Sequence, residues 1–142
     1  MGFIDSIKSF YFRAFDFRTR SSRSEFWYVF LAQILIFLPI EFIPSFLYLD
    51  LLVNAINILI FLPQVSLTVR RFHDVGMSGW WLICCPLVFL LMWAAVYFDT
   101  TFGNVFVAPF SLALLIIFIY LICKKGDVRD NKYGSDPLGL PK

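Results

Sequence analysis

Residues 51–81 read LLVNAINILIFLPQVSLTVRRFHDVGMSGWW, and this stretch decides the fold. Residues 51–69 are apolar apart from a few amides and hydroxyls, and a helix needs about 20 such residues to cross the hydrocarbon core of a bilayer. The charged residues RRFHD follow, and a short segment with Gly and Ser leads into a second apolar run that begins with two tryptophans. The stretch therefore predicts two membrane-spanning helices joined by a short basic turn.

Apolar runs of similar length flank this stretch on both sides. Pro39, Pro44 and Asp50 interrupt the N-terminal run, and the polar residues 99–104 interrupt the C-terminal one. The runs are continuous, whereas the strands of a membrane barrel alternate in hydrophobicity over about ten residues. We therefore expect an all-α integral membrane protein that forms a single membrane domain over residues 1–142. The four predicted transmembrane helices cover residues 26–43, 51–69, 80–98 and 105–123.

The composition favours the same fold class. Of the 142 residues, 60% are hydrophobic and only 15% are charged, whereas soluble domains average about 25% charged residues. A soluble core of this length could hardly bury eighteen phenylalanines and four tryptophans. An ordinary soluble domain is therefore excluded.

The basic residues predict an orientation. All twelve lysines and arginines lie before the first predicted helix, between the second and third, or after the fourth. Basic residues near the ends of membrane helices are retained on the cytoplasmic side. We therefore expect both termini to be cytoplasmic. Residues 1–25 would form a cytoplasmic or interfacial segment, and residues 124–142 a cytoplasmic tail.

Apolar residues recur at helical spacing before the first predicted span. Polar and charged residues fill the positions between them, which is typical of an amphipathic helix that lies in the headgroup layer. The alternative is a helix that packs against the cytoplasmic loops. The apolar face consists of Phe3, Ile7, Phe10, Ala14 and Phe17.

Four arginines are expected to lie together at the inner membrane surface. Guanidinium groups there can bind lipid phosphates, so the predicted partners are membrane lipids, and anionic ones in particular. Glu25, just before the first span, could pair with Arg71, Arg20 or Arg23. The predicted lipid-binding residues are Arg20, Arg23, Arg70 and Arg71.

Three segments together resemble the domain-of-unknown-function 805 family of small bacterial inner-membrane proteins. They read RRFHDVGMSGWW from residue 70, FRTRSSRSEFW from residue 17 and GDVRDNKYGSDP from residue 126. Thr19 and Asp130 stand where the family often has glycine. The resemblance implies a multi-pass protein of the cell inner (plasma) membrane and implies no reaction. Its cytoplasmic-turn motif corresponds to His73, Asp74, Gly76, Ser78, Gly79, Trp80 and Trp81.

Adjacent His73 and Asp74 invite a catalytic or metal-binding interpretation, because a carboxylate can orient an imidazole. Adjacent residues in a turn rarely point the same way, and the chain has no second histidine. We therefore expect a structural hydrogen bond from His73. The expected partner of Asp74 is Arg71, Arg20 or Arg23.

The sequence predicts no catalytic residue, no metal site and no cofactor. It contains no phosphate-binding loop, nucleophile elbow, zinc-ligand spacing or haem-attachment motif. The cysteines Cys84, Cys85 and Cys123 lie in or at the end of apolar runs, where they are expected to act as small buried hydrophobic residues.

A polar stripe runs along one face of the second predicted span. Lipid cannot satisfy amide groups, so the stripe must face protein or water. Hydrogen bonds that hold the helices together are the commoner use of such groups, and a solute path is the alternative. The stripe consists of Asn54, Asn57, Gln64 and Thr68.

These patterns favour a noncatalytic inner-membrane protein of unassigned activity. Its basic cytoplasmic face would engage anionic lipid or a protein partner, and nucleic acid is not an expected partner. One alternative is a small transporter or channel, which would be a homo-oligomer because four helices leave little room for a path. Another is a lipid-modifying enzyme that uses the His73–Asp74 pair.

Overall fold

The computed structural model describes residues 1–40, 42–43, 47–83, 87, 90–91, 93–94, 97, 105 and 108–139. Within these residues the secondary structure is helical apart from one isolated β-bridge between Asn131 and Gly134, which confirms the predicted all-α class there. Nine of the 19 residues of the predicted span 80–98 lie outside the described residues, among them the pair Cys84 and Cys85, as does the connection 99–104.

The helical elements follow the apolar runs closely. Helix α1 lies where the amphipathic helix is predicted, and α2, α3 and α5 coincide with three of the four predicted spans. The elements are α1 (Phe3–Phe12), α2 (Arg23–Ile40), α3 (Leu47–Asp74), the short 3-10 helix η1 (Gly79–Ile83) and α5 (Ala108–Cys123).

Helix α3 is longer than the predicted span at both ends. It begins at Leu47 and continues through the RRFHD segment to Asp74, so the turn starts at residue 75 rather than at residue 70. The helix can continue because the side chains of this segment find buried partners, described below. Helices α2 and α3 are long and apolar enough to cross a membrane, and α5 is a shorter apolar helix.

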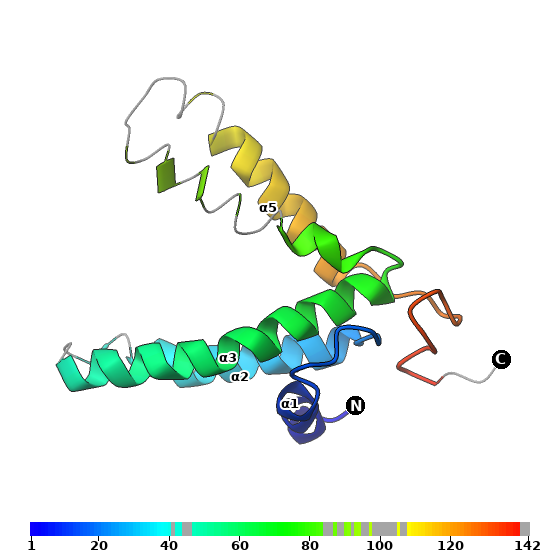
Figure 1. The fold of residues 1–142 in the computed structure, drawn as a ribbon, viewed down its shortest axis with the longest axis horizontal. Coiled ribbons are helices and arrows are strands. Elements are labelled where there is room, and N and C mark those ends of the chain that lie inside the picture. The colour runs from blue at the N-terminus through cyan, green and yellow to red at the C-terminus, as the bar shows by residue number, and fades with distance from the viewer. Residues whose placement is uncertain are drawn as a thin grey trace.

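Helices α2 and α3 form an antiparallel pair, and α1 is seen end-on beside them (Figure 1). The Gln33 amide nitrogen donates to the Gln64 side-chain oxygen at 2.9 Å and thus links α2 to α3. The beginning of α2, the end of α3, η1 and the end of α5 all gather at one end of the molecule, next to the C-terminal segment (Figure 1). Every segment that carries a sequence motif therefore meets at this end.

A small apolar core joins the elements at the same end. The buried side chains of Phe10, Phe26, Val29, Leu67 and Ile122 come from α1, α2, α3 and α5 and pack in one cluster. Further along α2 and α3, large apolar side chains are mostly exposed. Such extensive exposed apolar surface is expected where lipid is the solvent.

Candidate functional site

Five charged side chains form a buried cluster where the elements converge, and we call it the ion-pair junction. It joins the segment before α2, the first turn of α2 and the last turns of α3. Each of its side chains is at most 5% exposed, so the charges depend on one another and on main-chain carbonyls for solvation. The junction consists of Arg20, Glu25, Arg70, Arg71 and Asp74.

Arg20 uses all of its hydrogen-bonding capacity. Its Nε and Nη2 donate to Asp74 Oδ1 at 3.1 and 2.9 Å. Its Nη1 donates to the carbonyls of Arg129 and Gly134 at 2.8 and 3.3 Å, and Nη2 also donates to the carbonyl of Asp127. These bonds account for all five N–H groups of a guanidinium. Arg20 therefore binds the end of α3 and the C-terminal segment at once.

Arg71 connects α3 to the end of α5. Its Nε donates to the Ile122 carbonyl at 3.1 Å, while Nη1 donates to Asp74 Oδ2 and Nη2 to the Lys124 carbonyl. The prediction that Asp74 pairs with Arg71, Arg20 or Arg23 is confirmed for Arg71 and Arg20. Asp74 is therefore the carboxylate that pairs with both arginines in this half of the junction.

Glu25 and Arg70 form the other half of the junction. Glu25 accepts from Ser9 Oγ and Ser21 Oγ, both at 2.7 Å, and from Arg70 Nη1 at 3.2 Å. Because Ser9 is in α1, this carboxylate also fixes α1 to α2. Arg70 Nε and Nη2 are buried and have no hydrogen-bond partner among the described residues. Arg70 is therefore much less well satisfied than Arg20.

Gly126 packs directly against the Asp74 carboxylate. A Cβ atom at this position would lie 1.9 Å from Asp74 Oδ2, well inside van der Waals contact. The next residue, Asp127, donates its backbone N–H to the Asp74 carbonyl at 2.8 Å. The close approach of the tail to α3 therefore requires glycine at residue 126.

The turn after α1 is built around Asp16. Its carboxylate accepts from the backbone N–H groups of Arg18 and Thr19 at 3.1 and 3.2 Å, and from Arg13 Nε at 3.0 Å. Burial alone would raise the pKa of Asp16, but bonds from Thr19, Arg18 and Arg13 outweigh burial and lower the pKa to about 2. The Ser66 hydroxyl lies within hydrogen-bond distance of the Arg13 and Asp16 carbonyls, so α3 holds this turn in place.

His73 is held on two sides. Its Nδ1 lies 3.2 Å from the Thr19 carbonyl, and its ring stacks on Tyr133 with the centroids 3.8 Å apart. A carbonyl only accepts, so Nδ1 carries the proton and Nε2 is left as an acceptor. The structural hydrogen bond predicted for His73 is thus present. In the described part of the chain, no three His, Cys, Asp or Glu residues are placed to hold a metal ion.

The two glycines of the turn motif are favoured at their positions for different structural reasons. Gly76 has a φ of +77°, which favours glycine, and a Cβ on Gly79 would lie 2.7 Å from a methyl carbon of Val69. Ser78 Oγ accepts from the Trp80 backbone N–H at 3.4 Å. Both Trp80 and Trp81 are exposed, as expected for side chains at a membrane interface.

The polar stripe of α3 is divided by the structure. Thr68 is buried and donates to the Gln64 carbonyl at 2.8 Å, and Gln64 itself bonds to α2. Asn54 and Asn57 are exposed on the same helix. Gln64 of the stripe therefore links two helices, whereas Thr68 bonds only within α3.

The four arginines predicted to bind lipid fall into two groups. Arg20, Arg70 and Arg71 lie inside the junction, whereas Arg23 is exposed and reaches the Cys123 carbonyl at 3.4 Å. Cys123, predicted to be buried, is exposed because it ends α5 beside this side chain. Only Arg23 of the four is therefore accessible from outside the protein.

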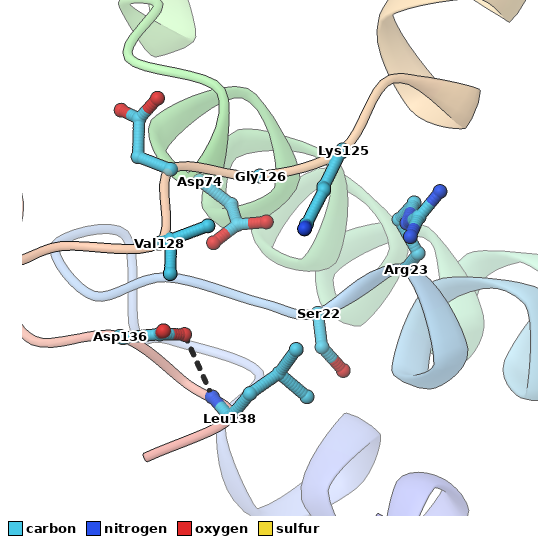
Figure 2. Close-up of a pocket in the computed structure, with 9 residues that line it drawn as sticks. Ser22, Arg23, Asp74, Lys125, Gly126, Val128, Asp136 and Leu138 are labelled. Carbon is cyan, nitrogen blue, oxygen red and sulfur yellow. Dashed lines mark hydrogen bonds between the residues drawn. The ribbon is translucent and has the colours of Figure 1, made fainter. Parts of the chain in front are cut away.

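A hollow of about 410 Å³ lies beside Arg23, between the start of α2 and the end of α5. Arg23, Ser24 and Trp27 are among the residues that line it. An adjoining space of about 40 Å³ shares Arg23 and adds Lys125, and both cations border it in Figure 2. Lys125 is not among the four residues predicted to bind lipid, although its position just after the fourth predicted span places it at the same interface.

Comparison with known proteins agrees with this architecture. The model of a family described as protein of unknown function (DUF805) matches residues 14–135. The inner membrane protein YhaI of Escherichia coli (strain K12) is 30% identical over 123 residues, which cover 85% of each chain. The inner membrane protein YhaH of the same strain is 28% identical over 127 residues, or 85% of this chain and 86% of YhaH. No solved structure matches the chain. The match includes all five residues of the ion-pair junction. The chain belongs to the DUF805 family.

Proposed function

We propose that this chain is an inner-membrane protein with four spans and cytoplasmic termini, and that its junction end binds anionic phospholipid through Arg23 and Lys125. The location of the relatives YhaH and YhaI and the long apolar helices α2 and α3 support the membrane assignment. The one-sided distribution of lysine and arginine supports the orientation. The buried junction then serves as a rigid support for this lipid-binding face.

The observation that carries the proposal is that the basic residues at this end of the protein differ in whether they form ion pairs. The buried arginines of the junction have carboxylate partners. In the described ranges, neither Arg23 nor Lys125 forms an ion pair. Both border the space of about 40 Å³, whose lining also includes three aspartates, and Trp27 lines the adjoining hollow beside Arg23. An anionic headgroup in that hollow would pair with the exposed Arg23, and a guanidinium offers a phosphate two parallel hydrogen bonds.

Helix α1 and the residues just after it also support the proposal that this end of the protein contacts lipid. Phe10 and Ala14 of the predicted apolar face are buried against the other helices. A second set of apolar side chains, Ile4, Phe12 and Phe15, points outward, with Phe12 and Phe15 exposed to 88% and 80%. Because α1 lies across α2 and α3 in Figure 1, it would lie along the membrane surface if they cross the bilayer. These aromatic side chains would then enter the headgroup layer.

We expect the double variant Arg23→Gln with Lys125→Gln to lose most of the phosphatidylglycerol or cardiolipin that the purified protein retains. Each basic residue near an anionic surface contributes about 1 kcal/mol, so retention should fall at least about tenfold. Native mass spectrometry of the detergent-purified protein measures this directly. The matched control, Arg129→Gln with Lys132→Gln, removes the same charge from exposed positions in the C-terminal segment. Equal loss from both variants would mean that net charge alone retains the lipid.

The topology is tested by labelling single cysteines in a variant without the native cysteines. Cysteines at residues 8, 78 and 135 should react only from the cytoplasmic side. Cysteines at residues 50 and 101 should react only from outside. Labelling of residue 78 from outside would exclude the four-span arrangement.

A further inference from the structure

A second hollow lies beside the turn motif, between α3 and η1. It encloses about 840 Å³, more than any one side chain fills. Its walls are mainly apolar, and the polar residues Gln64, Thr68, His73 and Ser78 also line it. Half of the polar stripe and much of the turn motif, separate features in the sequence, therefore line one groove. We call it the motif groove.

Thr68 and His73 of the motif groove are buried and Gln64 and Ser78 are half-buried, and these polar groups are only partly satisfied by the protein. Thr68 donates to the Gln64 carbonyl, and the Gln64 side-chain oxygen accepts from Gln33. Among the described residues, the Gln64 amide nitrogen and the Ser78 hydroxyl donate to no protein atom. His73 is only 7% exposed, and its Nε2 is an acceptor because Nδ1 donates to Thr19. The groove thus offers donors and one acceptor to an occupant.

The charge of the motif groove differs from that of the hollow at Arg23. Neither an arginine nor a lysine, and neither an aspartate nor a glutamate, is among the described residues that line it. A phosphate or carboxylate there would be buried without a counter-ion, which is strongly unfavourable. The occupant that fits is uncharged, has a hydroxyl donor and carbonyl acceptors in its head, and has apolar chains for the remaining walls.

We propose that the motif groove binds an uncharged glycerolipid of the diacylglycerol type. Its hydroxyl would donate to His73 Nε2, and its ester carbonyls would accept from Gln64 and Ser78. The acyl chains would lie along Phe61 and Ile83, which line the same groove. Trp80, which is 78% exposed, lies at the edge of the groove and reports on what enters it. This inference rests on the proposed membrane location and is independent of phosphate binding at Arg23.

The experiment uses the full chain in phosphatidylcholine nanodiscs, with Trp27, Trp81 and Trp93 replaced by Phe so that Trp80 is the sole tryptophan and can be excited selectively. Brominated dioleoylglycerol should quench Trp80 at mole fractions where brominated phosphatidylcholine does not. Replacing Gln64 by Leu and Ser78 by Ala should weaken the selective binding that this quenching reports at least about fivefold, since two hydrogen bonds to the lipid are lost. The matched control, Asn54→Leu with Ser135→Ala, makes similar polar-to-apolar changes outside the groove and should leave the quenching unchanged.

Three results would overturn the proposal. Quenching that follows the mole fraction of any brominated lipid would mean that the groove is not selective. Stronger quenching by brominated phosphatidylglycerol than by brominated diacylglycerol would mean that it takes a phosphate. Cross-linking between copies through a cysteine at residue 78, with no diacylglycerol effect, would mean that a second copy covers it. Failure of the membrane assignment itself would appear in the cysteine-labelling experiment instead, so the two failures are distinguishable.

Discussion

Replacing Asp74 by Asn should destabilise the protein by about 3–5 kcal/mol, the typical effect of removing one partner from a buried ion pair. The Asp74 carboxylate accepts from both Arg20 and Arg71, and its carbonyl accepts from the tail. An asparagine of the same shape would leave two buried guanidinium groups without a negative charge. We expect a lower midpoint in detergent unfolding. We also expect faster cleavage by trypsin after Arg129, because the tail is released.

Two comparisons separate this effect from a general loss of charge. Asp130→Asn removes a carboxylate from the exposed part of the tail and should leave stability nearly unchanged. Gly126→Ala keeps every charge but places a methyl group against the Asp74 carboxylate, so it should reproduce the destabilisation and the tail release. Normal stability of both Asp74→Asn and Gly126→Ala would mean that the junction does not hold the tail.

Sequence patterns predicted the positions of these helices well, because the length or the spacing of apolar residues indicates each of them. The positions of α2, α3 and α5 needed only the lengths of the apolar runs, and that of α1 needed only their spacing. The end of α3 was harder to predict, because charged residues usually mark the end of a span. In this chain Arg70, Arg71 and Asp74 continue the helix, since other segments bring them partners.

The junction itself was predictable only in part. The partners of Asp74 followed from opposite charges in motifs expected at one membrane surface. The pairing of Glu25 with Arg70 and the close contact of Gly126 with Asp74 did not follow, because they depend on how three helices and the tail pack. The main-chain carbonyls that bind Arg20 carry no sequence signal, since every residue has one.

The burial of three of the four arginines also changes how the basic residues are interpreted. Sequence reasoning treated Arg20, Arg23, Arg70 and Arg71 as one lipid-binding group because charge and position are the same for all four. Burial separates them, because the guanidinium groups of Arg20, Arg70 and Arg71 are not accessible to a lipid phosphate. We therefore interpret the turn motif as a structural fastening, and the lipid binding that we propose rests on Arg23 and Lys125 at its edge.

Replacing Arg70 by Met should destabilise the protein by about 3–5 kcal/mol, whereas combining it with Glu25→Gln should restore stability to within about 1 kcal/mol of the original. The single variant leaves the buried Glu25 carboxylate with only the Ser9 and Ser21 hydroxyls. In the double variant, the neutral amide that replaces this carboxylate keeps both hydroxyls as partners, and the methionine side chain fills the space of a guanidinium that had unsatisfied Nε and Nη2 atoms. Free energies of unfolding in mixed detergent, measured for both single variants and the double variant, give the coupling directly. Arg20→Met with Asp74→Asn is the matched comparison, and it should not recover, because Arg20 also binds three tail carbonyls that no methionine can satisfy. If the double variant of Arg70 and Glu25 also fails to recover stability, the Arg70 guanidinium has partners as strong as those of Arg20. The two halves of the junction would then be equivalent.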